Sequence, residues 1–455
     1  MTVPPTIAAV LSRLLRLRKR EVELGTSLLV LPFRLTAQVV LLAIFTVWLD
    51  SVLQDEYQRL PRWLRMSADD AKTILATLAG GSITVVALVV SLMMVVLSMV
   101  AGNFGPRIIL NFERRRTTQL AIGSFVAVFV YSLVSLATVL SGGTDTFAPV
   151  ISTWTAVVMV LMATGLLVVF VQDISSSIQV GNMLLDISTD LDAAIIRQRE
   201  LARRACAHTK VDIDDTNWSV IGALEPGYVQ NLDFDAMIEI GRRNDCIVRL
   251  LHRPGGFVHA GRPMAETSVP LPAADERLLR RAIVRGSHRT MEQDLEYAIA
   301  EYVEIALRAL SPAVNDPSTA ISCLDWIGDS LVALAVEPIG VAALADSSGT
   351  MRVVVPPNSL RRVVASAFNE IRQYSDTSPA VSIRMITTIE TVAPSIRDTD
   401  ALDEMRSQLE AVATTAVAAA KAQRDRDDID RAYQRADATL EALRPTDGEA
   451  SGIAP

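Results

Sequence analysis

The stretch ILATLAGGSITVVALVVSLMMVVLSMVAG, residues 74–102, decides the fold class of this chain. It carries no charge and exceeds the roughly 20 residues that a helix needs to cross a bilayer. Seven of its positions, spaced alternately three and four residues apart, share one helical face, and all of them except Met94 are small. We call this face the small-residue stripe, and its members are Thr77, Gly80, Thr84, Ala87, Ser91, Met94 and Ser98.

The small-residue stripe has two interpretations that sequence alone leaves open. Small residues at membrane interfaces let helix backbones approach closely, and Ser and Thr hydroxyls form hydrogen bonds between helices. A hydroxyl-bearing face can instead line a water-filled pore. The direction of Thr84 and Ser91 distinguishes these alternatives, because packing within one chain requires them to face a neighbouring span.

Composition places the chain among membrane proteins with a large soluble part. Of the 455 residues 50% are hydrophobic, and the mean hydropathy is +0.32. The net charge of −8 argues against nucleic acid as a partner. The three cysteines, Cys206, Cys246 and Cys323, are widely separated and odd in number, which predicts a reducing compartment rather than a disulfide framework.

Four apolar segments predict four spans, at residues 28–53, 74–102, 119–140 and 150–172. Arginine and lysine precede the first span and follow the second, whereas residues 141–149 contain neither. The positive-inside rule therefore predicts that both termini are cytoplasmic. Away from their ends the spans contain no Asp, Glu, Lys or His, which disfavours proton-coupled transporters, ion pumps and voltage sensors.

The C-terminal half predicts a mixed α+β cytoplasmic domain with a small β-rich module. The fourth span is expected to continue as an amphipathic helix to about residue 205. Short β-like runs follow at residues 219–223, 227–231, 246–252 and 256–259, interrupted by a helix at residues 234–243. A strand is expected at residues 351–355, an amphipathic helix at residues 360–374, and one charged helix at residues 400–443.

The most motif-like stretch, residues 289–320, suggests a candidate site. Asp316 before Pro317 has the pattern of a helix N-cap followed by proline at the first helical position. The break between two helices could hold an anion at a helix N-terminus or a cation between a carboxylate and an amide, or it could be only a capped joint. The candidate residues are Arg289, Asp294, Arg308, Asn315, Asp316 and Thr319.

Catalytic and metal-binding patterns are missing from the sequence. The four histidines are scattered, and no nucleophile elbow, zinc-binding motif or nucleotide-binding glycine loop occurs. We therefore expect no enzyme activity, no metal and no cofactor. The predicted organisation is a basic cytoplasmic N-terminus (1–27), four transmembrane helices (28–173), a cytoplasmic α+β domain (174–399), and a charged helix with a disordered tail (400–455).

Several segments, taken in order, resemble a known family. They are Gly105-Pro106-Arg107-Ile108, Ser177-Ile178-Gln179-Val180, Arg289-Thr290-x-x-Gln293-Asp294 and Leu310-Ser311-Pro312-x-x-Asn315-Asp316-Pro317-x-Thr319-Ala320. The chain resembles, over residues 28–392, the bacterial membrane proteins of domain-of-unknown-function family 2254. The resemblance implies a multi-pass protein of the bacterial inner membrane, and it implies no established activity.

Two functions remain as hypotheses. The first is a homo-oligomeric, channel-like pore in the lipid bilayer, lined by the second span and passing ions or a small solute, with the cytoplasmic domain as a gate or vestibule. The second is a membrane-anchored sensor or scaffold whose cytoplasmic domain binds a ligand or partner. The hydroxyl stripe and the absence of charge within the spans favour the first, and the size of the soluble half favours the second.

Overall fold

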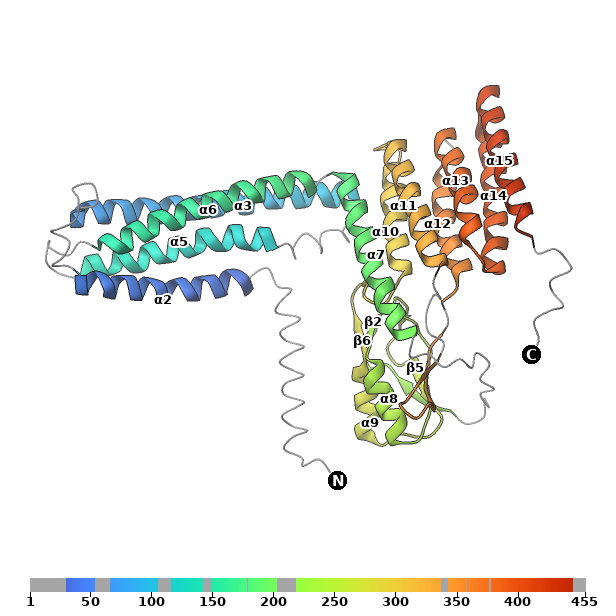
Figure 1. Cartoon of the computed structure of the whole chain (residues 1–455), viewed down its shortest axis with the longest axis horizontal. Helices are drawn as coiled ribbons and strands as arrows, with labels where there is room; N and C mark the ends of the chain where they lie inside the picture. The colour runs from blue at the N-terminus through green and yellow to red at the C-terminus, as the bar shows by residue number, and fades with distance from the viewer. Residues whose placement is uncertain are drawn as a thin grey trace. The chain divides into compact units, whose positions relative to one another are not determined.

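The computed structural model describes residues 30–53, 66–104, 116–141, 149–177, 179–202, 218–336, 343–356, 358–375 and 378–444. The chain divides into two compact units, Met1–Gln179 and Val180–Pro455 (Figure 1). The basic N-terminus and the tail after residue 444, which the sequence predicts to be disordered, lie outside the described residues.

Four long helices form the described part of the first unit: α2 (Val30–Leu53), α3 (Ala68–Phe104), α5 (Arg116–Ser141) and α6 (Val150–Ser177). Each is long and apolar enough to cross a membrane. The predicted four spans are therefore confirmed as candidate membrane helices. The second begins earlier than expected because Ser67 caps it: the Ser67 hydroxyl accepts a hydrogen bond from the Asp70 amide (3.1 Å), and the Asp70 carboxylate accepts one from the Ser67 amide (3.1 Å).

Helix α5 is the most buried of the four and packs against α2, α3 and α6. Its buried residues, which include Ala121, Phe125 and Val128, lie on several faces of the helix, as expected for a helix that contacts three others. Two apolar clusters fill the bundle around Phe125 and Phe170, and a third surrounds Tyr131. The side chains on the outer faces of these helices are mostly large and apolar, as expected for contact with lipid.

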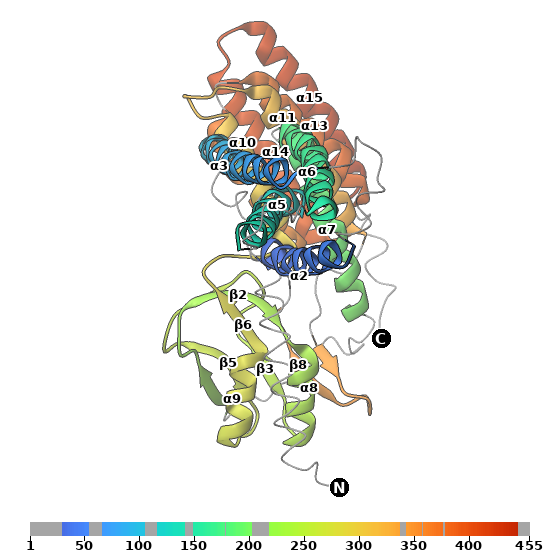
Figure 2. The same ribbon diagram turned by 90° about the vertical axis from the view of Figure 1, so that its left-hand side faces the viewer.

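The β-rich part of the second unit contains two small sheets (Figure 2). Among the described residues, one sheet has the strand order β1 (Ser219–Gly222), β5 (Pro263–Thr267), β3 (Val248–Leu250), β8 (Met351–Val354) and β7 (Ala343–Ala345). The other has the order β4 (Phe257–Val258), β2 (Gly227–Leu232) and β6 (Ile283–Gly286). Of the strand pairs formed by the described residues, β3–β8 alone is parallel. One apolar core joins both sheets to helices α8 (Phe234–Arg243) and α9 (Ala273–Ala282).

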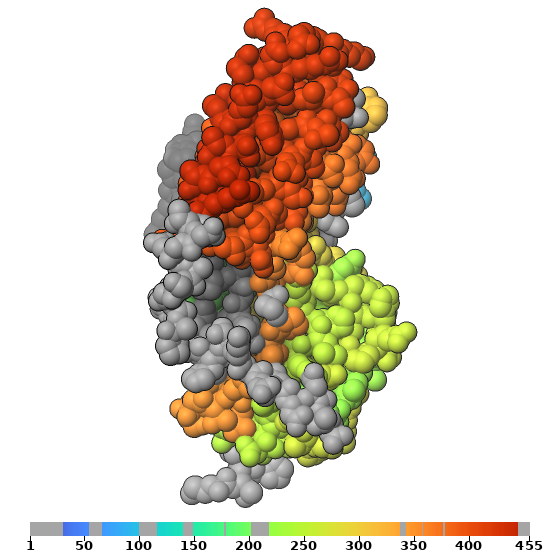
Figure 3. Space-filling model, turned by 90° about the vertical axis from the view of Figure 1, so that its right-hand side faces the viewer, coloured from blue at the N-terminus to red at the C-terminus, as the bar shows by residue number. Residues whose placement is uncertain are grey.

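A layer of helices completes the second unit. Its members are α7 (Val180–Ala202), α10 (Glu296–Ala309), α11 (Pro317–Ala335), α12 (Leu360–Tyr374), α13 (Pro379–Val392), the short turn η2 (Ala393–Ser395), α14 (Thr399–Ala419) and α15 (Gln423–Ala442). Helix α7 packs on α10 and α11, and the buried Tyr302 hydroxyl of α10 donates a hydrogen bond to the Leu184 carbonyl of α7 (3.1 Å). In Figure 3 the C-terminal helices, in orange and red, and the β-rich part, in yellow-green, occupy neighbouring regions of this unit. The predicted α+β domain with a β-rich module is therefore confirmed.

Two predicted helices are each divided in the structure. The prediction of one unbroken helix from the fourth span to residue 205 is wrong, because α6 ends at Ser177 and α7 begins at Val180. Serines 175–177 explain the break, because Ser hydroxyls compete for helix carbonyls, and Ser176 Oγ donates to the Asp173 carbonyl (2.9 Å). The prediction of a single helix at residues 400–443 is also wrong. Two helices, α14 and α15, form an antiparallel hairpin there, and each buries its apolar face.

Candidate functional site

The small-residue stripe lies on the free face of α3. All seven of its residues are exposed in the single chain, and Met94 is 63% exposed. The face of α3 that packs on the other helices is the opposite one, formed by Ala71, Leu75, Ala79, Ser82, Val89 and Val96. The stripe therefore does not pack against another described span of the same chain. It is left to lipid, to another protein or to water.

The stripe hydroxyls are partly satisfied within α3 itself. Thr77 Oγ1 donates to the Thr73 carbonyl (2.7 Å), and Thr84 Oγ1 donates to the Gly80 carbonyl (2.8 Å). These bonds let a hydroxyl sit in an apolar environment, because its proton already has an acceptor. An added Cβ at Gly80 would meet no atom within 4 Å. The stripe thus offers a shallow, weakly polar surface that remains open to a partner.

A glycine of α5 shows the contrasting arrangement. An added Cβ at Gly123 would lie 3.0 Å from Pro32 Cα and 3.1 Å from Leu35 Cδ1, both on α2. Gly123 therefore permits close contact between α2 and α5 within one chain, as small residues do in membrane helix pairs. Gly80 has no such neighbour, so its small size has no explanation inside the described bundle.

A buried polar cluster that sequence analysis missed lies at one end of the bundle. Asp50, in the last turn of α2, is fully buried and accepts hydrogen bonds from the Ile151 amide (2.8 Å), the Ser152 amide (2.9 Å) and the Ser152 hydroxyl (2.6 Å). It therefore caps the N-terminus of α6 from a neighbouring helix. Nearby in the sequence, Thr46 of α2 hydrogen-bonds to the buried Tyr131 hydroxyl of α5 (2.7 Å). The sequence signal that could have revealed this cluster is Asp50 itself, a single aspartate near the end of an apolar span.

The six predicted site residues of the second unit fall into two groups. Arg289 and Asp294 form an ion pair (2.7 Å) just before α10 begins. The remaining four lie at or beyond the C-terminal end of α10, which spans Glu296–Ala309 and is therefore about 20 Å long. The structure thus does not bring the two groups together.

Asp316 acts as the N-cap of α11. Its carboxylate accepts hydrogen bonds from the Ser318 amide (3.1 Å), the Thr319 amide (3.2 Å) and the Thr319 hydroxyl (2.6 Å). The Thr319 hydroxyl and these amides lower the pKa of Asp316 from its usual range. Asn315 adopts a left-handed backbone (φ 48°), and Arg308 lies 3.8 Å from Glu304 on its own helix. This geometry matches the capped-joint interpretation.

The Arg289–Asp294 pair belongs to a larger ionic cluster. Arg253 Nη2 lies 3.1 Å from Glu296 Oε2, and Arg362 Nη2 lies 2.8 Å from Glu296 Oε1. Burial raises the pKa of Asp294 and of Glu296, against the opposing effect of the neighbouring arginines. We call Arg253, Arg289, Asp294, Glu296 and Arg362 the arginine cluster.

Gly255 makes room for the arginine cluster. Its backbone has a φ of +81°, a region that L side chains rarely adopt, and an added Cβ would overlap the Asp294 carboxylate. The turn containing Gly255 is fixed to strand β2, because the Gly255 amide donates to the Val229 carbonyl (2.8 Å). The turn at residues 254–256 therefore positions a buried carboxylate as well as reversing the chain.

Two hollows in the second unit share part of their lining. The larger, of about 580 Å³, is lined by Arg197, Glu200 and Leu201 of α7 and by Asn231, Glu292 and Gln293. The smaller, of about 20 Å³, shares Leu201 and Gln293 and also contacts Arg253. Two hydrogen bonds fix Gln293 in this wall: its Oε1 accepts one from the Leu232 amide (2.9 Å), and its Nε2 donates one to the Leu232 carbonyl (3.1 Å).

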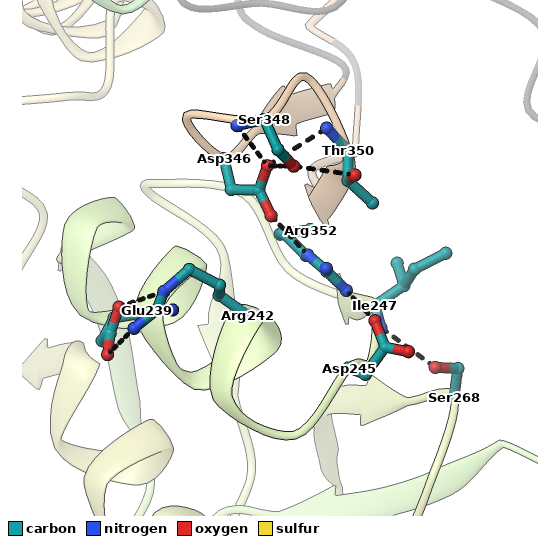
Figure 4. A network of polar contacts seen from close by, with 9 residues as sticks. All are labelled: Glu239, Arg242, Asp245, Ile247, Ser268, Asp346, Ser348, Thr350 and Arg352. Carbon is teal, nitrogen blue, oxygen red and sulfur yellow. Dashed lines mark hydrogen bonds and ion pairs between the residues drawn. The ribbon is translucent and has the colours of Figure 1, made fainter. Parts of the chain in front are cut away.

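A second polar network holds the β7–β8 hairpin in place (Figure 4). Asp346 accepts from the Ser348 and Thr350 amides (2.9 and 3.1 Å) and from Arg352 Nε (2.8 Å), while Arg352 Nη1 reaches Asp245 Oδ1 (2.8 Å). The Ser348 hydroxyl and Arg352 hold the pKa of Asp346 well below its usual range. These bonds satisfy the carboxylate, so the network is structural. In the described part of the chain, no three His, Cys, Asp or Glu residues are grouped as metal ligands.

Comparison with known proteins identifies the family of this chain. The model of the family "Predicted membrane protein (DUF2254)" matches residues 25–391. The uncharacterized proteins Rv1290c of Mycobacterium tuberculosis and Mb1321c of Mycobacterium bovis are each 26% identical over 367 residues, which cover 76% of this chain and 68% of each relative. No solved structure matches the chain significantly. The chain belongs to the DUF2254 family of predicted membrane proteins.

Proposed function

We propose that this protein forms a homo-oligomeric, channel-like pore in the bacterial inner membrane, lined by α3, whose small-residue stripe contacts a neighbouring copy at some depths and faces the pore at others. The observation that carries the proposal is the exposure of all seven stripe residues on the face opposite the packed face of α3. Large apolar residues suffice for contact with lipid, so a strip of Gly, Ala, Ser and Thr on the outside favours contact with another helix or with water.

The interior of one subunit argues for a path between subunits. The bundle is filled around α5 by closely packed apolar side chains, including Val89, Phe125, Val128 and Phe170. The polar cluster around Asp50 and Tyr131 is fully buried. We therefore place the path for ions or a small solute at the stripe, a polar surface on the outside of the described bundle.

Chemistry along the stripe fits a weakly selective pore. Its hydroxyls and glycine backbone can hydrate a passing solute, and it presents no charge that would bind an ion tightly. The positive-inside pattern predicts that both termini are cytoplasmic, and this orientation supports a role of the second unit as a vestibule or gate. A membrane-anchored sensor or scaffold is the second candidate, and the cavity of about 580 Å³ in the second unit favours it.

Conductance measurements on charge-substituted variants test the pore. Thr84→Asp and Ser91→Asp place carboxylates on the stripe at two depths, and Ser98→Asp places one nearer the cytoplasmic end. In a wet lumen they should be tolerated and should raise the preference for cations over anions. Leu92→Asp is the matched control, because Leu92 is exposed but lies off the stripe. It should insert poorly, since a carboxylate in lipid costs about 2.5–3.5 kcal/mol at mid-membrane.

The wild type and the four variants would be compared in planar bilayers, with the oligomer checked by cross-linking. A selectivity shift in the stripe variants alone supports the pore. No current from any intact oligomer refutes the pore and leaves the sensor or scaffold.

A further inference from the structure

The larger hollow of the second unit lies where helix α7, strand β2 and the segment before α10 meet. Its volume of about 580 Å³ lies within the range of small-molecule sites. Two elements of its wall are held without the help of charged groups. Gln293 is hydrogen-bonded to the Leu232 backbone, and Leu201 packs against the apolar core of the β-rich part. The shape of the hollow therefore does not depend on the charged side chains that line it.

Three charged side chains of opposite sign line this hollow without pairing with one another. In the part of the chain that the structure describes, Arg197, Glu200 and Glu292 form no ion pair. Arg197 Nε instead donates a hydrogen bond to the Glu292 main-chain carbonyl (3.3 Å), and Glu292 Oε2 accepts one from Asn231 Nδ2 (3.4 Å). All three charged residues are exposed, so a molecule in the hollow can reach them.

The signs of these charges select the class of ligand. A simple anion in the hollow would meet the carboxylates of Glu200 and Glu292, and a simple cation would meet the guanidinium of Arg197. A molecule that carries one carboxylate and one ammonium group meets an opposite charge at each end. A guanidinium binds a carboxylate through parallel N–H donors. The three donors of an ammonium group need oxygen acceptors, which the two glutamates and Asn231 can supply.

We propose that this hollow binds a small zwitterion of the amino-acid class, with its carboxylate on the Arg197 guanidinium and its ammonium group on Glu200 and Glu292. Leu201 offers an apolar wall to the rest of the ligand. The ligand would contact both α7, which follows α6 in the chain, and the β-rich part of the second unit. This site names a ligand class for the sensor alternative and does not rest on the proposed pore.

Calorimetric titration of the purified full-length protein tests the site. Glycine, L-leucine and L-glutamine would each be added up to about 20 mM, because ion pairs between exposed groups are weak and a millimolar dissociation constant is expected. Isoamylamine and isocaproate are matched controls, since they are leucine without its carboxylate and without its ammonium group. Sodium chloride keeps the ionic strength equal.

We expect at least one of the three amino acids to bind and to raise the melting temperature. If leucine binds, both matched controls should bind at least about tenfold more weakly. Failure of all three amino acids to bind would overturn the proposal. Binding of either control as tight as that of leucine would also overturn it, because the site would then recognise a single charge. These measurements involve no current, so their failure leaves the proposed pore untouched.

Variants of the exposed charged residues locate the site. Arg197→Gln should weaken amino-acid binding about tenfold or more, and it should strengthen isoamylamine binding because a repelling charge is gone. The double variant Glu200→Gln/Glu292→Gln should weaken amino-acid binding as well and should favour isocaproate instead. Glu410→Gln, at an exposed position of α14, is the control and should bind as the wild type does. Unchanged amino-acid binding in both the Arg197 variant and the double variant would refute the site.

Discussion

Two glycine substitutions in the membrane unit should have opposite consequences. Gly123→Leu places a side chain where a Cβ alone would lie 3.0 Å from Pro32 Cα and 3.1 Å from Leu35 Cδ1. Because Pro32 presents backbone, α2 must move away from α5. Gly80→Leu places the same side chain on the stripe, where an added Cβ meets nothing within 4 Å. The first change should destabilise the single chain, and the second should act only between chains.

The size of the difference follows from the cost of overpacking. Inserting carbon atoms into a filled site costs typically about 1–3 kcal/mol, which lowers the folding equilibrium constant about 5- to 150-fold for Gly123→Leu. Gly80→Leu adds no such cost within the chain and gains up to about 1 kcal/mol of helix propensity. Unfolding by sodium dodecyl sulfate in detergent micelles measures the first effect. Light scattering on the detergent-solubilised protein measures whether the oligomer persists.

Two results would refute this reasoning. If Gly80→Leu shifts the unfolding midpoint as far as Gly123→Leu does, the stripe is buried within the chain rather than free. If Gly80→Leu unfolds normally and assembles as the wild type does, the stripe is not a contact between subunits, and the pore loses the surface on which it depends.

Four further outcomes are expected. Asp316→Ala should lower stability by about 1 kcal/mol through loss of the α11 cap, whereas Asp316→Ser should retain stability and function, and loss of function without a change in melting would indicate a binding site. Folding lowers the pKa of Asp316, so its carboxylate should stabilise the folded protein fully above the ordinary aspartate pKa. This stabilisation should be lost as the pH falls through the folded pKa. The difference in melting temperature between wild type and Asp316→Ala should therefore be smaller in acid. Gly255→Ala should destabilise the second unit by about 1–3 kcal/mol, because it combines a φ of +81° with overlap on Asp294, and an unchanged melting temperature would contradict this. In a cysteine-free background, Cys introduced at Thr144 should react with an impermeant reagent in intact cells, whereas Cys introduced at Gly448 should not. The reverse labelling pattern would show that the predicted topology is wrong.

Sequence alone predicted those parts of the fold that depend on local patterns. The spans followed from length and apolarity, and the amphipathic helix at residues 234–243 has the bounds of α8 because Asp233 caps it and its apolar residues share one face. The Asp316 cap was also predicted, because capping involves residues within a few positions of each other. Strands β5, β6 and β7 were missed, since short strands are defined by partners distant in the chain.

The candidate sites depended on long-range geometry that no local pattern contains. Arg289 and Asp294 were predicted together with Asp316, but α10 separates them. Arg253, Glu296 and Arg362 were not predicted at all, because they come from a turn and two helices that are far apart in the sequence. The stripe was visible as a helical face, yet sequence could not show whether that face was the buried one.

The cost of glycine within α3 bears on the choice between a lipid-facing and a protein-facing stripe. A glycine inside a helix is less favourable than alanine by up to about 1 kcal/mol, so its retention needs a compensating contact. At Gly123 the compensation is the close approach of α2. At Gly80 no atom of the described chain lies close enough to provide one, and lipid chains gain nothing from a missing methyl group. A second protein surface does gain, because it can approach the backbone of α3 closely. We therefore propose that the compensating contact for Gly80 lies outside the single chain, and this supports the proposed subunit interface on α3.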